Sequence, residues 1–294
     1  MTLVIKIGGA AGVATESILN EIAQYLTTPG ADRRIVLVHG GSDLTNELAK
    51  DLGHEVRTLT SPGGMTSRYT DRETLRIYAM AVAGQINTEL VARLQGRGIN
   101  ALGLAGVDGR LLLARRKAAT RALTSDGRVQ IVRDDYTGQI EQVNARLLET
   151  LLDAGYLPVV APLALSYEGE RLNVDGDRAA AALAGALGAR DLVIATNVPG
   201  LLRDPQDRNS LIRQVEAERL EEYSAYAQGR MRKKMLGAKE AITGGVARIH
   251  IGNAPLVDLL NGAGTTIEAA RRRQEIQRRL CSAATSPVAS EALL

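Results

Sequence analysis

The feature that most constrains the fold is the alternation of short apolar runs with longer segments of helical periodicity. Ile18, Ile22 and Leu26 recur every four residues, and so do Val143, Leu147 and Leu151. Apolar runs of strand length surround these segments: Leu3–Ile7, Ile35–His39, Ala101–Leu104, Tyr156–Ala161, Asp191–Thr196 and Arg248–Ile251. Strands that alternate with helices predict βαβ units. We therefore expect an α/β fold with an open, mainly parallel sheet sandwiched by helices.

Turn signals and a change of composition predict how the rest of the chain is organised. Ser61–Gly64, Ser125–Gly127 and Tyr167–Glu170 separate β-like segments and indicate hairpins on one rim. Thr70–Glu73 has the form of a capping box and begins the longest helical pattern, which runs towards Gln95. From about residue 268 the chain is basic and then loses its periodicity. We expect one domain over 1–267 and a basic, partly disordered tail over 268–294.

Composition excludes several classes of protein. Aromatic residues make up only 3% of the chain, with no Trp and no Phe, so too few rings exist to stack single-stranded nucleic acid. The net charge of +3 does not change this, and we expect no nucleic-acid partner. The single cysteine, Cys281, excludes an intramolecular disulfide and a Cys-rich zinc site. We find no signal-like N-terminus and no apolar run of membrane-spanning length, and we expect a cytoplasmic protein without a membrane partner.

Two glycine pairs follow the first two predicted strands, in Lys6–Gly9 and in His39–Gly41. Backbone N–H groups of such turns can bind phosphate at the carboxyl ends of parallel strands, although a glycine pair can also be a simple tight turn. The chain has neither the P-loop nor the dinucleotide-binding glycine pattern. A phosphate site at these turns must therefore be of another kind.

Several charged residues allow both a structural and a functional interpretation. Lys6 lies in an apolar strand and needs an anionic partner or solvent. Asp175 or Asp177 can cap the following Ala-rich helix, or Asp177 can orient lysines. Arg68 can bind a carboxylate through two parallel hydrogen bonds or can be a surface arginine. Lys234, within a basic run, would by itself be interpreted as solvated charge. The histidines His39, His54 and His250 lack metal-binding spacing, and we expect them to be structural.

Taken together, six motifs resemble the amino acid kinase family in order and spacing, over residues 3 to about 267. They are Lys6–Gly9, His39–Gly41, Arg68 before Asp71, Asn173–Asp177, Asn197–Leu201 and Gly229–Lys234. Within the family the chain is most similar to the acetylglutamate kinase branch. Finer features resemble the LysW-aminoadipate kinases, and these are Ser67–Leu75, Asp135–Gly138 and Ala164–Glu168. Ser42 departs from the third glycine that is usual in acetylglutamate kinases.

The resemblance implies an ATP- and Mg²⁺-dependent kinase that phosphorylates the side-chain carboxylate of 2-aminoadipate linked to an acidic, LysW-like carrier protein. Carrier-linked glutamate and N-acetylglutamate remain alternative acceptors. A non-catalytic sensor with the same fold is less favoured, because Lys6, Asp177 and Lys234 are all present. We also expect a homo-oligomer, in the form of a dimer. Basic residues at Arg115–Lys117 and Arg230–Lys233 are candidates for docking the carrier.

The resemblance also implies roles for individual residues. Lys6 and Lys234 would stabilise the transferred phosphoryl group, and Asp177 would hold both lysines in register. The substrate-binding residues would be Gly40, Gly41, Arg68 and Asn173. Phosphate and nucleotide would be bound by Gly8, Gly9, Asn197, Gly200, Gly229 and Met231. We expect no protein metal site, with Mg²⁺ held mainly by the ATP phosphates. An acceptor lobe would extend to about residue 170, with hairpins over the acceptor site, and a nucleotide lobe would follow.

Overall fold

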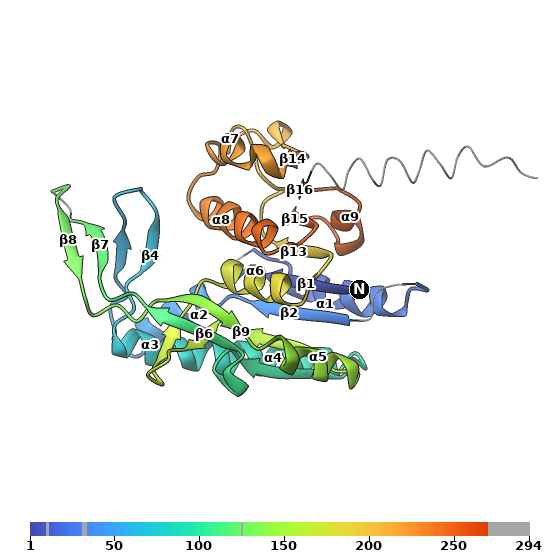
Figure 1. The fold of residues 1–294 in the computed structure, drawn as a ribbon, viewed down its shortest axis with the longest axis horizontal. Helices are drawn as coiled ribbons and strands as arrows, with labels where there is room; N and C mark the ends of the chain where they lie inside the picture. The colour runs from blue at the N-terminus through green and yellow to red at the C-terminus, as the bar shows by residue number, and fades with distance from the viewer. Residues whose placement is uncertain (10–11, 31–33, 125, 270–294) are drawn as a thin grey trace, which may run out of the picture.

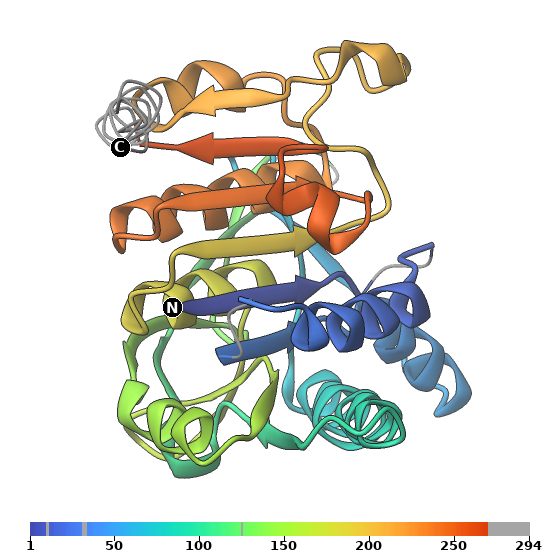
Figure 2. The ribbon, with the colours of Figure 1, turned by 90° about the vertical axis from the view of Figure 1, so that its right-hand side faces the viewer.

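An eight-stranded sheet forms the centre of the computed structural model, which describes residues 1–9, 12–30, 34–124 and 126–269. The strand order is β14 (Gln214–Glu216), β16 (Thr265–Glu268), β15 (Arg248–Gly252), β13 (Asp191–Ala195), β1 (Thr2–Ile7), β2 (Arg34–His39), β10 (Leu157–Ala161) and β5 (Ala101–Ala105). Neighbouring strands are parallel except β15 and β16, so β14 and β16 run against the others (Figure 2). The predicted fold class, an open and mainly parallel α/β sheet, is confirmed.

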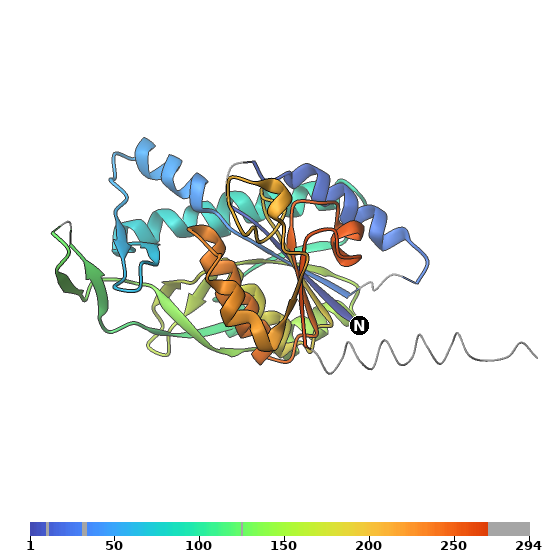
Figure 3. The same cartoon turned by 90° about the horizontal axis from the view of Figure 1, so that it is seen from above.

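Helices cover both faces of this sheet (Figure 3). Leu3 and Ile5 of β1 pack in a cluster with α1 (Thr15–Thr27), α4 (Asn87–Gln95) and α9 (Leu256–Leu260). Val4 points to the opposite face, because side chains alternate along a strand. That face is covered by α5 (Ala145–Asp153), α6 (Gly176–Ala186) and α8 (Arg230–Thr243). Lys6 has the same parity as Val4 and therefore lies on the α6 and α8 side.

A second, smaller sheet and two hairpins lie beside the central sheet. The four-stranded sheet has the order β12 (Arg171–Asn173), β11 (Leu163–Leu165), β6 (Leu112–Arg116) and β9 (Gly138–Val143). The hairpins pair β3 (Thr58–Thr60) with β4 (Thr66–Arg68) and β7 (Thr120–Leu123) with β8 (Val129–Val132), and they project to the left in Figure 1. All three predicted turns connect paired strands, although Ser125 itself lies outside the described residues.

The remaining elements are α2 (Ser42–Asp51), α3 (Arg72–Ala79), the π-helical segment η1 (Met80–Ile86), α7 (Leu220–Ser224), and the 3₁₀ turns η2 (Asp108–Arg110), η3 (Arg208–Ser210) and η4 (Ala217–Arg219). Among them, α3 and η1 join α4 to form one long helical stretch between β4 and β5, and the others are separate short elements. Within the described ranges, no helix has both the length and the apolar character needed to cross a membrane. The tail from residue 270 lies outside the described residues, so the domain boundary and the two lobes stay predictions.

Two details of the predicted helices are wrong. The N-cap of α3 is Asp71, whose carboxylate accepts a hydrogen bond of 2.7 Å from the Thr74 N–H, and not Thr70. Thr70 is buried and is hydrogen-bonded elsewhere, because tertiary partners compete for its hydroxyl group. Val143 ends β9, whereas Leu147 and Leu151 lie on α5 as expected. An apolar residue at helical spacing can equally end a preceding strand, so periodicity alone does not locate the boundary.

Candidate active site

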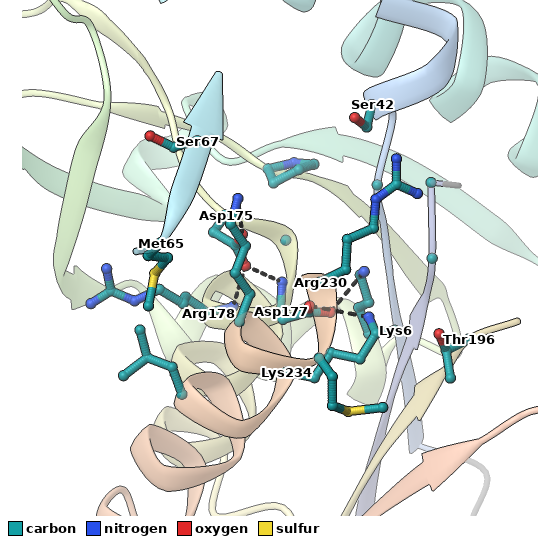
Figure 4. A pocket seen from close by; sticks show the side chains of 18 of the residues that line it. Lys6, Ser42, Met65, Ser67, Asp175, Asp177, Arg178, Thr196, Arg230 and Lys234 are labelled. Atoms are coloured by element: carbon teal, nitrogen blue, oxygen red, sulfur yellow. Dashed lines mark hydrogen bonds and ion pairs between the residues drawn. The ribbon is translucent and has the colours of Figure 1, made fainter. Parts of the chain in front are cut away.

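A cavity of 520 Å³ opens at the carboxyl ends of β1, β2 and β13 (Figure 4). It lies where ligands bind in open α/β sheets. Its lining includes nearly all of the residues singled out from the sequence, namely Lys6, Gly8, Gly9, Gly40, Gly41, Arg68, Asn173, Asp177, Asn197, Gly200, Met231 and Lys234. Gly229 does not line the cavity; it is the N-cap of α8 with a φ of 50°. Segments distant in the sequence thus converge on one cavity.

A buried carboxylate between two lysines lies at the base of the cavity. The Lys6 ammonium is 2.7 Å from Asp177 Oδ1, and the Lys234 ammonium is 3.2 Å from Asp177 Oδ2. Each of the three residues is less than one-tenth exposed, at 6%, 5% and 8% for Lys6, Asp177 and Lys234. Figure 4 shows the three side chains pointing toward one another from β1, α6 and α8. We call this cluster the lysine–aspartate triad.

Local sequence explains how the triad assembles. Asp175 caps α6, since its Oδ1 accepts hydrogen bonds from the N–H groups of Asp177 (2.9 Å) and Arg178 (3.3 Å). Asp177 is then free to point at the lysines, so the two aspartates divide the two roles that the sequence left open. Helix α8 passes close to α6 at Gly237, where an added Cβ would lie 3.1 Å from the Asp177 carbonyl oxygen. This close approach brings Lys234, one turn earlier, to Asp177.

The electrostatics of the triad favour an anionic ligand. Burial by itself would raise the pKa of Asp177, but the charges and hydrogen bonds of Lys6 and Lys234 outweigh it and lower the pKa to about 2. Burial, together with the charge of Lys6, lowers the pKa of Lys234. One carboxylate between two ammonium groups leaves one positive charge without a protein counter-charge within the triad. A phosphoryl group in the cavity would supply the missing negative charge.

The two glycine pairs meet backbone to backbone above the triad. A Cβ added to Gly9 would lie 2.3 Å from the Gly41 nitrogen, so no side chain fits there. Gly8 donates a 3.1 Å hydrogen bond to the Ala195 carbonyl, and Gly40 donates one of 3.0 Å to the Ile7 carbonyl. Helix α2 begins directly after Gly41, at Ser42. Both turns and a helix N-terminus therefore border the same cavity.

Arg68 reaches the cavity from the β3–β4 hairpin and is held in position by α2. Its Nη1 donates to Asn46 Oδ1 at 2.7 Å, and its Nη2 donates to the Ser42 carbonyl at 2.9 Å and to Ser42 Oγ at 3.3 Å. Asn46 was not identified from the sequence. Its spacing of four residues from Ser42 places both on one face of a helix, which is the only local signal.

A buried hydrogen-bond network orients Asn173 at the end of β12. The Asn173 Nδ2 donates to Thr70 Oγ1 at 2.9 Å, which leaves its carbonyl oxygen available to accept a hydrogen bond from a ligand. Asp135, only 1% exposed, accepts from the Thr70 N–H (3.2 Å), Thr120 Oγ1 (3.0 Å) and Thr137 Oγ1 (2.8 Å). Sequence reasoning noted the Asp135–Gly138 motif but assigned it no role. Asp135 joins Asn173 to the base of the β7–β8 hairpin.

The Arg115–Lys117 cluster is less uniform than its sequence suggests. Arg115 pairs with Glu141 at 2.5 Å, and the Arg116 guanidinium stacks 3.7 Å above the Tyr136 ring and donates to the Asp135 carbonyl. Lys117 is exposed and lines the cavity. In the second cluster, Arg230 and Lys233 line the cavity as well. Arg116 is therefore part of the local structure, while Lys117 remains exposed at the cavity.

The histidines do not form a metal site. His54 contacts Thr74 Oγ1 at 2.9 Å, and His250 contacts Asp191 Oδ1 at 3.0 Å; neither lines the cavity. His39 is buried beneath the Gly40–Gly41 turn, with 1% exposure. Within the part of the chain that the structure describes, no group of three or more His, Cys, Asp or Glu side chains is placed to bind a metal ion.

Comparison with known proteins agrees with this geometry. A sequence profile described as the amino acid kinase family matches residues 1–253. The chain belongs to the amino acid kinase family. Kinases take their phosphoryl group from ATP, so ATP is the expected donor, and the resemblance noted in the sequence is confirmed.

Individual relatives cover most of the chain. This chain is 49% identical over 271 residues to the [LysW]-aminoadipate kinase of Thermus thermophilus, and the match covers 90% of this chain and 99% of that protein. It is 48% identical to the [LysW]-aminoadipate kinase of Deinococcus radiodurans, covering 90% and 91%. Among solved structures, smu.665 from Streptococcus mutans superimposes with a TM-score of 0.72 at 25% identity, covering 91% of this chain and 98% of that chain.

Proposed function

We propose that this protein transfers the γ-phosphoryl group of ATP to the side-chain carboxylate of 2-aminoadipate whose amino group is linked to a LysW-like carrier protein. The product is an acyl phosphate, a step in lysine biosynthesis. The observation that carries this proposal is the lysine–aspartate triad beside two glycine turns. The names of the Thermus and Deinococcus relatives support the choice of acceptor.

The proposed chemistry needs charge stabilisation more than acid–base catalysis. A carboxylate is already ionised near neutral pH, so its attack on the γ-phosphorus requires no general base. Negative charge spreads over the phosphoryl oxygens as the bond to the leaving oxygen breaks. Lys6 and Lys234 would face these oxygens, held at fixed positions by Asp177. The N–H groups of the glycine turns would add donors that need no rearrangement during the reaction.

Magnesium would enter together with the nucleotide. Mg²⁺ usually retains several waters and is bound by substrate phosphates with one or two carboxylates, and not by an all-protein cage. Asp177 is occupied by both lysines, which makes it a poor candidate for a metal ligand. We therefore propose that the ATP phosphates supply most of the ligands. Asn197, Gly200 and Met231, together with Gly8 and Gly9, would border the nucleotide.

The acceptor would bind in the part of the cavity that β4 and β12 supply. Arg68, already oriented by Ser42 and Asn46, would hold the α-carboxylate. Asn173 would accept a hydrogen bond from the amide N–H that links the amino acid to its carrier. Lys117, an exposed residue of the cavity lining, is placed to attract an acidic carrier. We also retain the prediction of a homodimer.

One assay tests the proposal and separates the acceptors. The protein is incubated with ATP, Mg²⁺ and hydroxylamine, and the acyl phosphate is trapped as a hydroxamate. Carrier-linked aminoadipate, carrier-linked glutamate and N-acetylglutamate are offered in parallel. Preference for carrier-linked aminoadipate by kcat/KM is the expected result. Preference for either glutamate acceptor contradicts the assignment to lysine biosynthesis, and no hydroxamate with any acceptor contradicts the kinase itself.

A further inference from the structure

His39 lies directly below the Gly40–Gly41 turn, and its contacts define its tautomer. Asn87, at the start of α4, places its Nδ2 at 3.1 Å from His39 Nε2 and 2.9 Å from the Val159 carbonyl oxygen. A carbonyl can only accept, so the Asn87 atom facing Val159 is the nitrogen. His39 Nε2 must then accept a hydrogen bond and carry no proton. The proton of the neutral ring is on Nδ1, which lies 3.2 Å from the Gly40 carbonyl oxygen.

Fixing the Gly40 carbonyl also fixes the direction of the Gly41 N–H. The described chain contains no cis peptide bond, so the carbonyl oxygen and N–H of the Gly40–Gly41 peptide point in opposite directions. The carbonyl points to the His39 ring, and Gly41 lines the cavity. The N–H of Gly41 is thereby directed away from the ring.

Two further features show that the position of Asn87 is closely specified. A Cβ added to Gly103 of β5 would lie 2.1 Å from Asn87 Oδ1, so glycine is the residue that leaves room for this amide. Asn87 directly follows the π-helical segment η1. Val82 and Ile86 of η1 pack against Gly41, because a Cβ added to Gly41 would lie 2.5 Å from Val82 and 2.9 Å from Ile86. A π-helical segment inside a longer helix is often found at functional sites.

We propose that Asn87 and a neutral His39 are positioning residues that lock the Gly40–Gly41 turn, so that the Gly41 N–H faces the transferred phosphoryl group. This inference rests on the proposed kinase function and adds to it residues that touch no substrate. Charging His39 would place a second donor against the Asn87 amide and break the lock. Burial opposes protonation of the ring, and the charge of Lys6 adds to it, so the pKa of His39 is lowered to about 4.

Two substitutions of His39 separate the lock from simple packing. In His39→Asn the side-chain amide nitrogen replaces Nδ1 and can still donate to Gly40. In His39→Gln the amide replaces Nε2, so the contact with Asn87 is kept and that with Gly40 is lost. Both variants should lose similar thermal stability. We expect His39→Asn to keep most of the parent's kcat and His39→Gln to lose about 10- to 100-fold, the effect of a misplaced reacting geometry.

Two glycine variants, one test and one control, probe the position of Asn87 without changing Asn87 itself. Gly103→Ala should displace the Asn87 amide and lower kcat with little change in the KM for either substrate. Gly84→Ala is the control, because nothing lies within 4 Å of its added Cβ. Equal kcat in His39→Asn and His39→Gln, or a Gly103→Ala variant as active as Gly84→Ala, would overturn the proposal. A parent protein that forms no hydroxamate would instead contradict the proposed function.

The tautomer can be measured without any assay of activity. The chain has three histidines, so ¹⁵N spectra of histidine-labelled protein contain three rings to assign, and His39→Asn identifies the signal of His39. We expect a neutral ring with the proton on Nδ1 from pH 8 to about pH 5. A ring protonated on Nε2 in the parent protein overturns the proposed lock, whatever the kinetic results.

Discussion

The triad and the hairpin rim are built differently, although the triad, the β3–β4 hairpin and Lys117 line the same cavity. The triad is buried, and its charges are held by ion pairs between side chains of β1, α6 and α8. The rim, formed by the β3–β4 and β7–β8 hairpins and the Arg115–Lys117 segment, carries mostly exposed charge. Buried, paired charges keep their geometry and their strength, whereas exposed ones are screened by water and salt. We therefore expect the triad to determine turnover and the rim to determine which acceptor binds.

The largest expected effect is on turnover. Lys6→Ala or Lys234→Ala should lower kcat about 100- to 1,000-fold, because each removes one preorganised donor to the phosphoryl oxygens. Folding should persist, since Asp177 keeps one lysine partner. Lys239→Ala, on an exposed side of α8 and paired with Glu221, is the matched control. If kcat of either triad variant stays within threefold of the parent, the triad does not determine turnover.

Arg68 belongs to the rim, as the last residue of β4, and it also lines the cavity, so it tests whether this part of the rim binds the acceptor or the nucleotide. Arg68→Lys keeps the charge but cannot form two parallel bonds to a carboxylate, so the KM for the acceptor should rise about tenfold. The KM for ATP should remain unchanged. Steady-state kinetics with each substrate varied in turn provides the measurement. A higher KM for ATP with an unaltered acceptor KM would assign Arg68 to the nucleotide.

The free energy of unfolding should depend on pH, and the lowered pKa of the buried His39 determines the direction of the change. Its pKa falls from 6.5 to about 4 on burial, so below about pH 6.5 the unfolded chain binds a proton that the folded chain does not. The free energy of unfolding should therefore decrease as pH falls. Relative to His39→Asn, the parent should lose about 1.4 kcal/mol between pH 7.5 and 5.5, measured by urea unfolding. Groups common to both proteins, such as Asp177, cancel, and a constant difference would mean that His39 is not buried neutral.

The smallest effect is expected for the rim, on the KM for carrier-linked substrate and on how this KM changes with salt concentration. The double variant Arg115→Ser and Lys117→Ser should raise the KM for carrier-linked substrate about threefold and leave kcat nearly intact, the result of lost uniform binding. Its KM should also depend less on salt between about 20 and 300 mM. Arg116 is left in place because it stacks on Tyr136. An unchanged KM and salt dependence would leave Arg230 and Lys233 as the remaining docking candidates.

Much of the fold followed from local patterns in the chain. The strands β1, β2, β5, β10, β13 and β15 lie within a residue or two of their predicted bounds, because short apolar runs ending in turns are a local signal. The N-cap of α3 was shifted, since several polar residues in a row can each act as a cap. The start of α5 was shifted because Val143, an apolar residue at helical spacing, ends the preceding strand. The π-helical segment and the mixed direction of β16 had no signal in the sequence.

The order of the six motifs and the resemblance that they carry were enough to name Lys6, Asp177 and Lys234 as candidates, and for Lys6 its place in an apolar strand was a signal of its own. They were not enough to show which partner each charge has. Asp175 and Asp177 could not be told apart until the start of α6 was known. Three findings depend on contacts between segments far apart in the chain. Asp135 supports Asn173 through Thr70, Asn87 contacts His39, and Gly103 leaves room for the Asn87 amide. Hydrogen bonds of this kind are decided by tertiary packing, since their donors and acceptors have no local periodicity.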